Sequence, residues 1–146
     1  MTTRTRRLVV GICVLGAIVD AVAALALASP PDSLLRRIAY PGVASGQVDF
    51  AEGTRTAAPL MLGWTVLLVW AAARPVERRA VLAATALVVA GFVVVELSDV
   101  GLGNAALGLM LPTLALQLVL ATWFVVAWAL ARRAGVRPAP EPEARP

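Results

Sequence analysis

The residues best suited to chemistry in this sequence are a few polar side chains that lie inside long hydrophobic runs. Asp20 is the one ionisable residue in an apolar run of 21 residues from Leu8 to Ala28. An acid at the centre of a membrane span costs about 2.5 to 3.5 kcal/mol on an insertion scale, so such a side chain must face protein or water. We therefore expect Asp20 to have a hydrogen-bond partner on another helix.

Three further polar residues lie at comparable depth in other hydrophobic runs. Counting about 1.5 Å per residue from the external end of each run puts Asp20, Thr65 and Gln117 about 12 Å deep and Thr113 about 6 Å deep. Thr113 and Gln117 share one side of a helix because four residues separate them. We predict one intramembrane polar cluster of these four residues, in which Gln117 donates a hydrogen bond to the Asp20 carboxylate and Thr65 lies close by.

Two acids near the end of another run, Glu96 and Asp99, form a second candidate site. Glu96 lies about 3 Å below the predicted helix end at Ser98, so both side chains could line an external acidic mouth. In the functional interpretation, Asp20 is a proton or cation site and this mouth leads to it. In the structural interpretation, which we favour, Asp20 joins two helices and the other acids lie in interfacial water, because one acid with hydroxyl and amide neighbours suffices for helix association.

The residue types that are missing exclude most catalytic chemistry. All 13 basic residues are arginine, histidine is absent, and Cys13 is the only cysteine. These absences remove the usual general base, the usual haem ligand, most zinc sites and any intrachain disulfide. Asp20 and Glu96 also differ by about 9 Å in counted depth, which argues against a concerted acid–base pair. We predict a non-enzymatic protein with no catalytic residue, no cofactor and no metal site.

The elements that must position these side chains are four membrane-spanning helices. The chain is 60% hydrophobic and 15% charged, with a mean hydropathy of +0.81, which is far more apolar than a soluble domain. Four runs are long enough to cross a bilayer, and none alternates with period two as barrel strands do. The predicted fold is an all-α four-transmembrane-helix bundle within residues 1–133, with spans at about 8–28, 57–73, 80–98 and 109–131.

Two helix faces are predicted to pack against each other. The first span has a narrow face of small residues and one acid, formed by Cys13, Gly16 or Ala17, Asp20 and Ala24. Small residues let a neighbouring helix approach closely, which is a common packing device in membranes. The fourth span carries a face formed by Thr113, Gln117, Ala121 and Phe124. We expect these two faces to meet.

Arginine placement predicts the orientation. Ten of the 13 arginines flank the N-terminus, the turn between the second and third spans, and the C-terminal tail, and the other three lie in the loop from Ser29 to Thr56. Because cytoplasmic flanks collect positive residues, both termini are predicted to be cytoplasmic. The pI near 11 is then a topology signal. Nucleic-acid binding is not expected, because the basic residues are divided among short flanks without an aromatic platform.

The segments outside the spans suggest little chemistry. In the first loop, Leu34, Leu35 and Ile38 fall on one side of a short helix that we expect to lie in the membrane interface, and residues 43–56 suggest an irregular return. The tail, 134–146, is proline-rich and predicted to be disordered. A cleavable signal peptide is the alternative for the first span, although its apolar stretch exceeds the usual 7 to 15 residues.

Three segments together resemble a known group of proteins: LMLGWTVLLVWAAARPVERRAVL from Leu60, ELSDV from Glu96, and MLPTLALQ ending at Gln117. They are similar to uncharacterised four-helix integral membrane proteins of bacteria, and the similarity covers less than half of the chain. The resemblance implies a four-helix fold and a place in the bacterial cytoplasmic (plasma) membrane. It implies no established activity.

The function predicted from these observations is that of a non-enzymatic integral membrane protein that packs with itself or with a partner. Its expected partners are the lipid bilayer and either a second copy or another membrane protein, with no nucleic acid. The alternative is a small proton- or cation-coupled carrier that uses Asp20.

Overall fold

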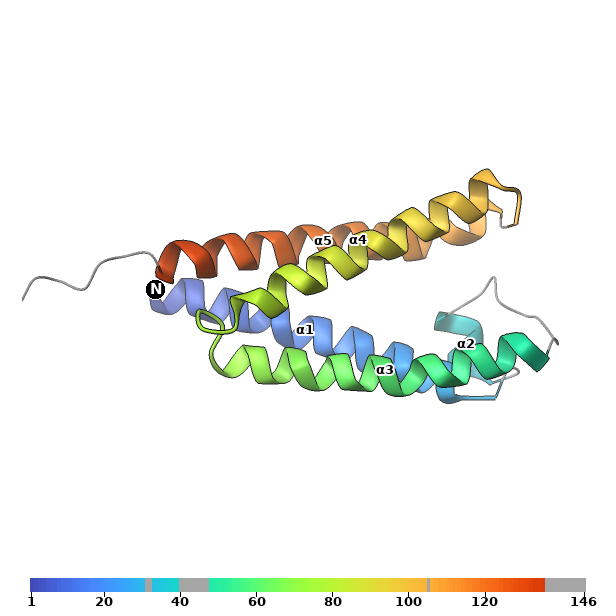
Figure 1. The fold of residues 1–146 in the computed structure, drawn as a ribbon, viewed down its shortest axis with the longest axis horizontal. Coiled ribbons are helices and arrows are strands. Elements are labelled where there is room, and N and C mark those ends of the chain that lie inside the picture. The colour runs from blue at the N-terminus through green and yellow to red at the C-terminus, as the bar shows by residue number, and fades with distance from the viewer. Residues whose placement is uncertain (31–32, 40–47, 105, 136–146) are drawn as a thin grey trace, which may run out of the picture.

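The computed structural model describes residues 1–30, 33–39, 48–104 and 106–135, and these form five helices (Figure 1). The helices are α1 (Thr3–Ala28), α2 (Leu34–Ala39), α3 (Val48–Ala73), α4 (Arg79–Gly101) and α5 (Leu107–Gly135). Each of α1, α3, α4 and α5 contains a stretch long and apolar enough to cross a membrane. The prediction of an all-helical chain with four such segments is confirmed. The proline-rich tail expected at 134–146 lies, from residue 136 on, outside the described residues.

The helices extend beyond the predicted apolar runs because local groups satisfy their ends. At the start of α1, the Thr2 hydroxyl accepts a hydrogen bond of 3.2 Å from the Thr5 backbone N–H, which is a side-chain N-cap. Helix α4 continues to Gly101 and ends where Gly103 adopts φ 76°, a left-handed conformation that glycine adopts without strain. The helices are therefore longer than the hydrophobic runs, because polar residues and caps continue them at their ends.

The prediction for the loop before the second span is wrong in part. From Val48 onward the chain is helical, so the irregular return expected over residues 43–56 is absent over 48–56, while 43–47 lie outside the described residues. Helix α3 thus begins 11 residues before Pro59, which lies inside it. A proline within a helix removes one backbone hydrogen bond, but the helix continues through it here. The short helix expected near Leu34 is present as α2.

The long helices form two antiparallel pairs, α1 with α3 and α4 with α5. The two pairs touch each other less, through α1 against α5 and, more weakly, α3 against α4. Figure 1 shows the pairs meeting at the end where the N-terminus lies and diverging toward the other end. We call the first the arginine end, because it carries Arg4, Arg6, Arg7, Arg74, Arg78, Arg79, Arg132 and Arg133. The opposite end is the far end.

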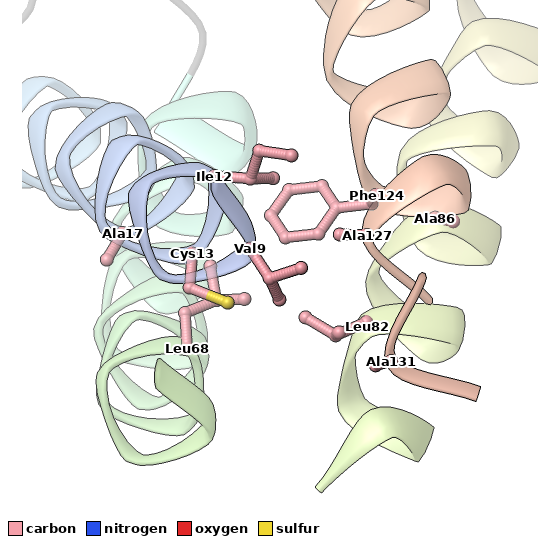
Figure 2. Packing of buried hydrophobic residues seen from close by; sticks show 10 residues of the cluster. All are labelled: Val9, Ile12, Cys13, Ala17, Leu68, Leu82, Ala86, Phe124, Ala127 and Ala131. Carbon is pink, nitrogen blue, oxygen red and sulfur yellow. The ribbon is translucent and has the colours of Figure 1, made fainter. Parts of the chain in front are cut away.

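The contact between the pairs is made by a compact apolar cluster (Figure 2). The Phe124 ring of α5 lies against Gly16 of α1, where an added Cβ would be only 2.5 Å from the ring atom Cζ. Val9 and Leu82 are fully buried beside it. The buried residues of α4 are Leu82, Thr85 and Ala86, all within about its first two turns. The two pairs are therefore joined in the half of the molecule nearer the arginine end.

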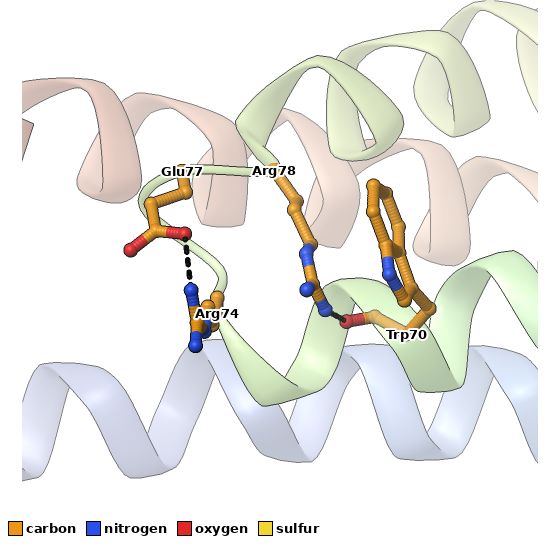
Figure 3. Close-up of polar contacts among 4 residues, drawn as sticks. All are labelled: Trp70, Arg74, Glu77 and Arg78. Atoms are coloured by element: carbon orange, nitrogen blue, oxygen red, sulfur yellow. Dashed lines mark hydrogen bonds and ion pairs between the residues drawn. The ribbon is translucent and has the colours of Figure 1, made fainter.

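Arginine side chains cover the turn between α3 and α4 (Figure 3). The Arg78 guanidinium lies 3.9 Å from the centroid of the Trp70 ring and also donates a hydrogen bond to the Trp70 carbonyl oxygen. Arg74 forms an exposed ion pair of 3.3 Å with Glu77. A cation over an indole face and a bond to an open helix carbonyl both favour arginine at the end of a helix.

Candidate functional site

The first polar group joins the two helices of one pair. Thr65 Oγ1 of α3 donates a hydrogen bond of 3.0 Å to Asp20 Oδ2 of α1, and it also lies 3.0 Å from the Met61 carbonyl oxygen. Asp20 and Thr65 are both half-buried. The expected proximity of Asp20 and Thr65 is confirmed.

The second polar group joins the helices of the other pair, and it corrects two predictions. Gln117 Nε2 donates to Glu96 Oε1 at 2.6 Å, and Thr113 Oγ1 donates to Glu96 Oε2 at 3.1 Å. The predicted bond from Gln117 to Asp20 is therefore wrong, and the four-residue cluster is divided between two helix pairs. Thr113 and Gln117 lie one turn apart on α5, so the two side chains hold the Glu96 carboxylate between them.

Helix ends explain why the counted depths failed. Helix α4 runs to Gly101, so Glu96 lies about 8 Å from its end, where the sequence count gave about 3 Å. Helix α5 begins at Leu107, which puts Thr113 about 9 Å from that end. Glu96 is thus level with Thr113. When a helix ends three residues later than predicted, the depth of a side chain counted from that end changes by almost one helical turn.

The register between the two helix pairs is a second reason why Gln117 does not bond to Asp20. Gly16 of α1 lies against Phe124 of the antiparallel α5, and this pairing places Asp20, four residues later, level with Leu120. Gln117 lies a further turn toward the far end, where the pairs diverge. The two predicted faces do meet, as expected, with Gly16 against Phe124. Cys13, Gly16, Ala17 and Ala24 of the small-residue face are all buried.

The predicted acidic mouth is changed by the placement of Glu96. Both Glu96 carboxylate oxygens accept hydrogen bonds from α5, so this acid is part of a contact between helices. Asp99, nearly one turn later on α4, is half-exposed, and its backbone carbonyl accepts a bond of 2.9 Å from the Asn104 N–H. A role for either acid at an external entrance stays a prediction.

One amide oxygen of the second group has no partner in the described part of the chain. Gln117 Oε1 is buried and accepts no hydrogen bond there. An unsatisfied buried acceptor costs about 1 to 3 kcal/mol. The amide is thus held by its donor side alone.

A polar contact that the sequence did not indicate links the two pairs. Trp64 Nε1 of α3 donates a 3.1 Å hydrogen bond to Thr85 Oγ1 of α4, and Thr85 in turn donates to the Val81 carbonyl oxygen at 2.8 Å. Thr85 is 3% exposed. The available signal was the indole N–H, since a tryptophan within an apolar run needs an acceptor.

The two carboxylates can each accept hydrogen bonds from a neighbouring helix, and each can bind a proton. Within the described residues, no three histidine, cysteine, aspartate or glutamate side chains come together as a metal site. Each acid is paired with hydroxyl or amide groups that belong to its own helix pair. The arrangement suits helix association and proton binding.

Comparison with protein-family models, with curated proteins and with solved structures found no match to this chain.

Proposed function

We propose that this chain is a multi-pass protein of the bacterial cytoplasmic membrane that functions by packing with another membrane protein or a second copy of itself. Its four long helices form a bundle, α2 lies in the external interface, and both termini are cytoplasmic. The orientation rests on the arginine end, where the N-terminus, the turn between α3 and α4, and the end of α5 lie together. The exposed Leu34 and Ile38 of α2 support its interfacial position.

The observation that carries the interaction is a face that opens between the two helix pairs. Along one side of α4, exposure rises from 3% at Thr85 to 39% at Val88, 48% at Phe92 and 58% at Val95. These residues recur at three- and four-residue steps, so they share one side of the helix. Thr85 faces α3, because it accepts a hydrogen bond from Trp64. The same side of α4 therefore still faces α3 farther along, where the two pairs separate.

Helix α3 shows the same trend on its own side. Leu68 is 1% exposed, Trp64 is partly buried, and Leu60, two turns from Leu68, is 75% exposed. We define the interpair face as Leu60, Val88, Phe92 and Val95. It is apolar, widens toward the far end, and can receive a transmembrane helix by van der Waals packing.

Crosslinking in native membranes tests this proposal. In a Cys13→Ala background, Phe92→Cys places one thiol on the interpair face, and Val94→Cys places one on the opposite side of the same helix. Val94 is 63% exposed, so it is a matched control. We expect Phe92→Cys to give a crosslinked product with a second copy or a partner, and Val94→Cys to give none. Equal crosslinking at both positions, or none at Phe92, would contradict the proposal.

A carrier that moves protons or cations is the second candidate, and hydroxyl geometry favours it. Thr65 lies 3.0 Å from both Asp20 and the Met61 carbonyl, and Thr113 lies 2.8 Å from the Met110 carbonyl and 3.1 Å from Glu96. Each hydroxyl can donate to a charged acid, or accept from a protonated acid while donating to its carbonyl. Both states of each acid therefore keep their hydrogen bonds.

Proton flux in liposomes tests the carrier. Purified protein is reconstituted with an internal pH-sensitive dye, and a potassium gradient with valinomycin supplies the driving potential. The carrier predicts that Asp20→Asn abolishes dye-reported flux and that Glu77→Gln, at an exposed turn, leaves it unchanged. Wild-type flux equal to that of empty liposomes would exclude a proton carrier.

A further inference from the structure

A shallow groove on the outer surface of the α1–α3 pair has one charged end and an otherwise apolar lining. Its volume is about 710 Å³. Gly11, Val14 and Ile18 of α1 form one side, Ala72 and Ala73 of α3 form the other, and Arg6 and Arg7 lie at its arginine end. The groove therefore has the polarity of a lipid molecule, with a cationic end and an apolar body.

From Arg7 to Ile18 the groove is about as long as one leaflet of a bilayer is deep. Arg7, Gly11, Val14 and Ile18 follow at steps of four, three and four residues, so they form one stripe along α1. Eleven residues of helix span about 16 Å. One leaflet of a hydrocarbon core about 30 Å thick is about 15 Å deep. A chain in this groove would reach from the arginine end to the middle of the bilayer.

Gly11 contributes no side chain to the lining of the groove. A Cβ at this position would meet no atom within 4 Å, so the missing side chain leaves open space beside the helix. Val14 and Ile18 on the same stripe are 44% and 55% exposed. The lining is thus accessible along its length.

The charged end of the groove is suited to a phosphate group. Arg6 and Arg7 are exposed and form no ion pair within the described residues. Guanidinium groups bind phosphate through two parallel N–H donors. The hydroxyl-bearing Thr3 also lines this end, in the first turn of α1, where the helix dipole favours an anion.

We propose that this groove binds one anionic phospholipid, with its phosphate on Arg6 and Arg7 and an acyl chain along Gly11, Val14 and Ile18. The proposal rests on the membrane location proposed above and goes beyond it, since general attraction of arginines to a charged leaflet needs no groove. It is also independent of the interpair face, which lies between the two helix pairs.

The test measures phosphatidylglycerol retained by the purified full-length protein in native mass spectrometry, with phosphatidylcholine and inorganic phosphate as comparison ligands. We expect one phosphatidylglycerol to be retained in preference to phosphatidylcholine, and millimolar phosphate not to displace it. A double Arg6→Gln, Arg7→Gln variant should bind about 30-fold more weakly, because each arginine near an anionic surface contributes about fivefold. Arg137→Gln with Arg145→Gln removes equal charge from the C-terminal tail and should leave affinity unchanged.

The variant that separates a groove from simple charge attraction is Gly11→Phe, which keeps every arginine and fills the hollow. It should abolish retention, and the smaller Gly11→Leu should weaken it. Gly91→Phe is the matched control, because a Cβ at Gly91 also meets nothing within 4 Å. Circular dichroism shows whether each variant is folded.

Wild-type retention of phosphatidylglycerol by Gly11→Phe and Gly11→Leu would overturn the proposal, as would equal retention of phosphatidylcholine by the wild type. Neither result would affect the membrane location, which fails only if the protein does not insert into bilayers. The crosslinking at Phe92 reports on the interaction proposal separately.

Discussion

The two ends of the molecule differ in how closely the helix pairs approach. From the arginine end to the middle of α1 the pairs are in contact: Val9 and Leu82 are fully buried, and Gly16 lets the Phe124 ring lie directly on α1. Toward the far end, Leu60 and Val95 are largely exposed. A close approach requires a small residue opposite a large one, as at Gly16 and Phe124.

The polar contacts differ in which helices they join. The bonds between Asp20 and Thr65 and between Glu96 and Gln117 join helices within a pair. The bond from Trp64, the neighbour of Thr65 on α3, to Thr85 joins one pair to the other. The first kind of contact stabilises each pair, and the second helps to decide how the two pairs sit together.

The largest expected effect comes from breaking the close approach. Gly16→Leu places a branched side chain where even a Cβ is 2.5 Å from the Phe124 ring, so the pairs must separate. We expect a loss of about 3 kcal/mol in unfolding free energy, at the upper end of overpacking costs. Denaturant unfolding in detergent micelles measures it. Gly91→Leu should have little effect, and adding Phe124→Leu to Gly16→Ala should recover stability lost in Gly16→Ala.

Double-mutant cycles distinguish the two polar groups. Glu96→Ala with Gln117→Ala should give a coupling energy of about 0.6 kcal/mol and at most about 1.7, the average and the maximum measured for hydrogen bonds between membrane helices. Asp20→Ala with Gln117→Ala should be additive within about 0.5 kcal/mol, because these residues belong to different pairs. A larger coupling of Asp20 with Gln117 would mean that the two pairs share one polar cluster after all.

A smaller loss is expected where the pairs are joined by a hydrogen bond. Thr85→Val keeps the side-chain shape but removes the acceptor of the Trp64 indole, and should cost about 0.6 kcal/mol. Thr122→Val is the control, since the Thr122 hydroxyl bonds only to the Leu118 carbonyl of its own helix. Thermal unfolding in detergent compares the two. Equal losses would show that the contact between pairs adds nothing.

The smallest effect is expected at the surface of the arginine end. Arg74→Gln removes the ion pair between Arg74 and Glu77. The two side chains are 65% and 66% exposed. Water and salt screen such a pair, so we expect a change below about 0.5 kcal/mol in the same unfolding assay. A change above 1 kcal/mol would show that the turn between α3 and α4 contributes to holding the pairs together.

The sequence by itself determined the helical class, the four long apolar helices and the gathering of arginines at one end. These properties depend on the length and composition of each segment, which no partner alters. It also predicted that Asp20 lies beside Thr65, and that the small-residue face around Gly16 packs against the side of α5 that carries Phe124.

Only the tertiary structure decided which polar side chains are partners. The pairing of Gln117 with Glu96 depends on where α4 and α5 end, and those ends are set by turns and caps outside the apolar runs. The separation of Gln117 from Asp20 depends on the register between Gly16 and Phe124. A side chain on a helix moves about 1.5 Å and 100° with each residue of offset, so depth counted along one helix cannot choose between neighbours on two others.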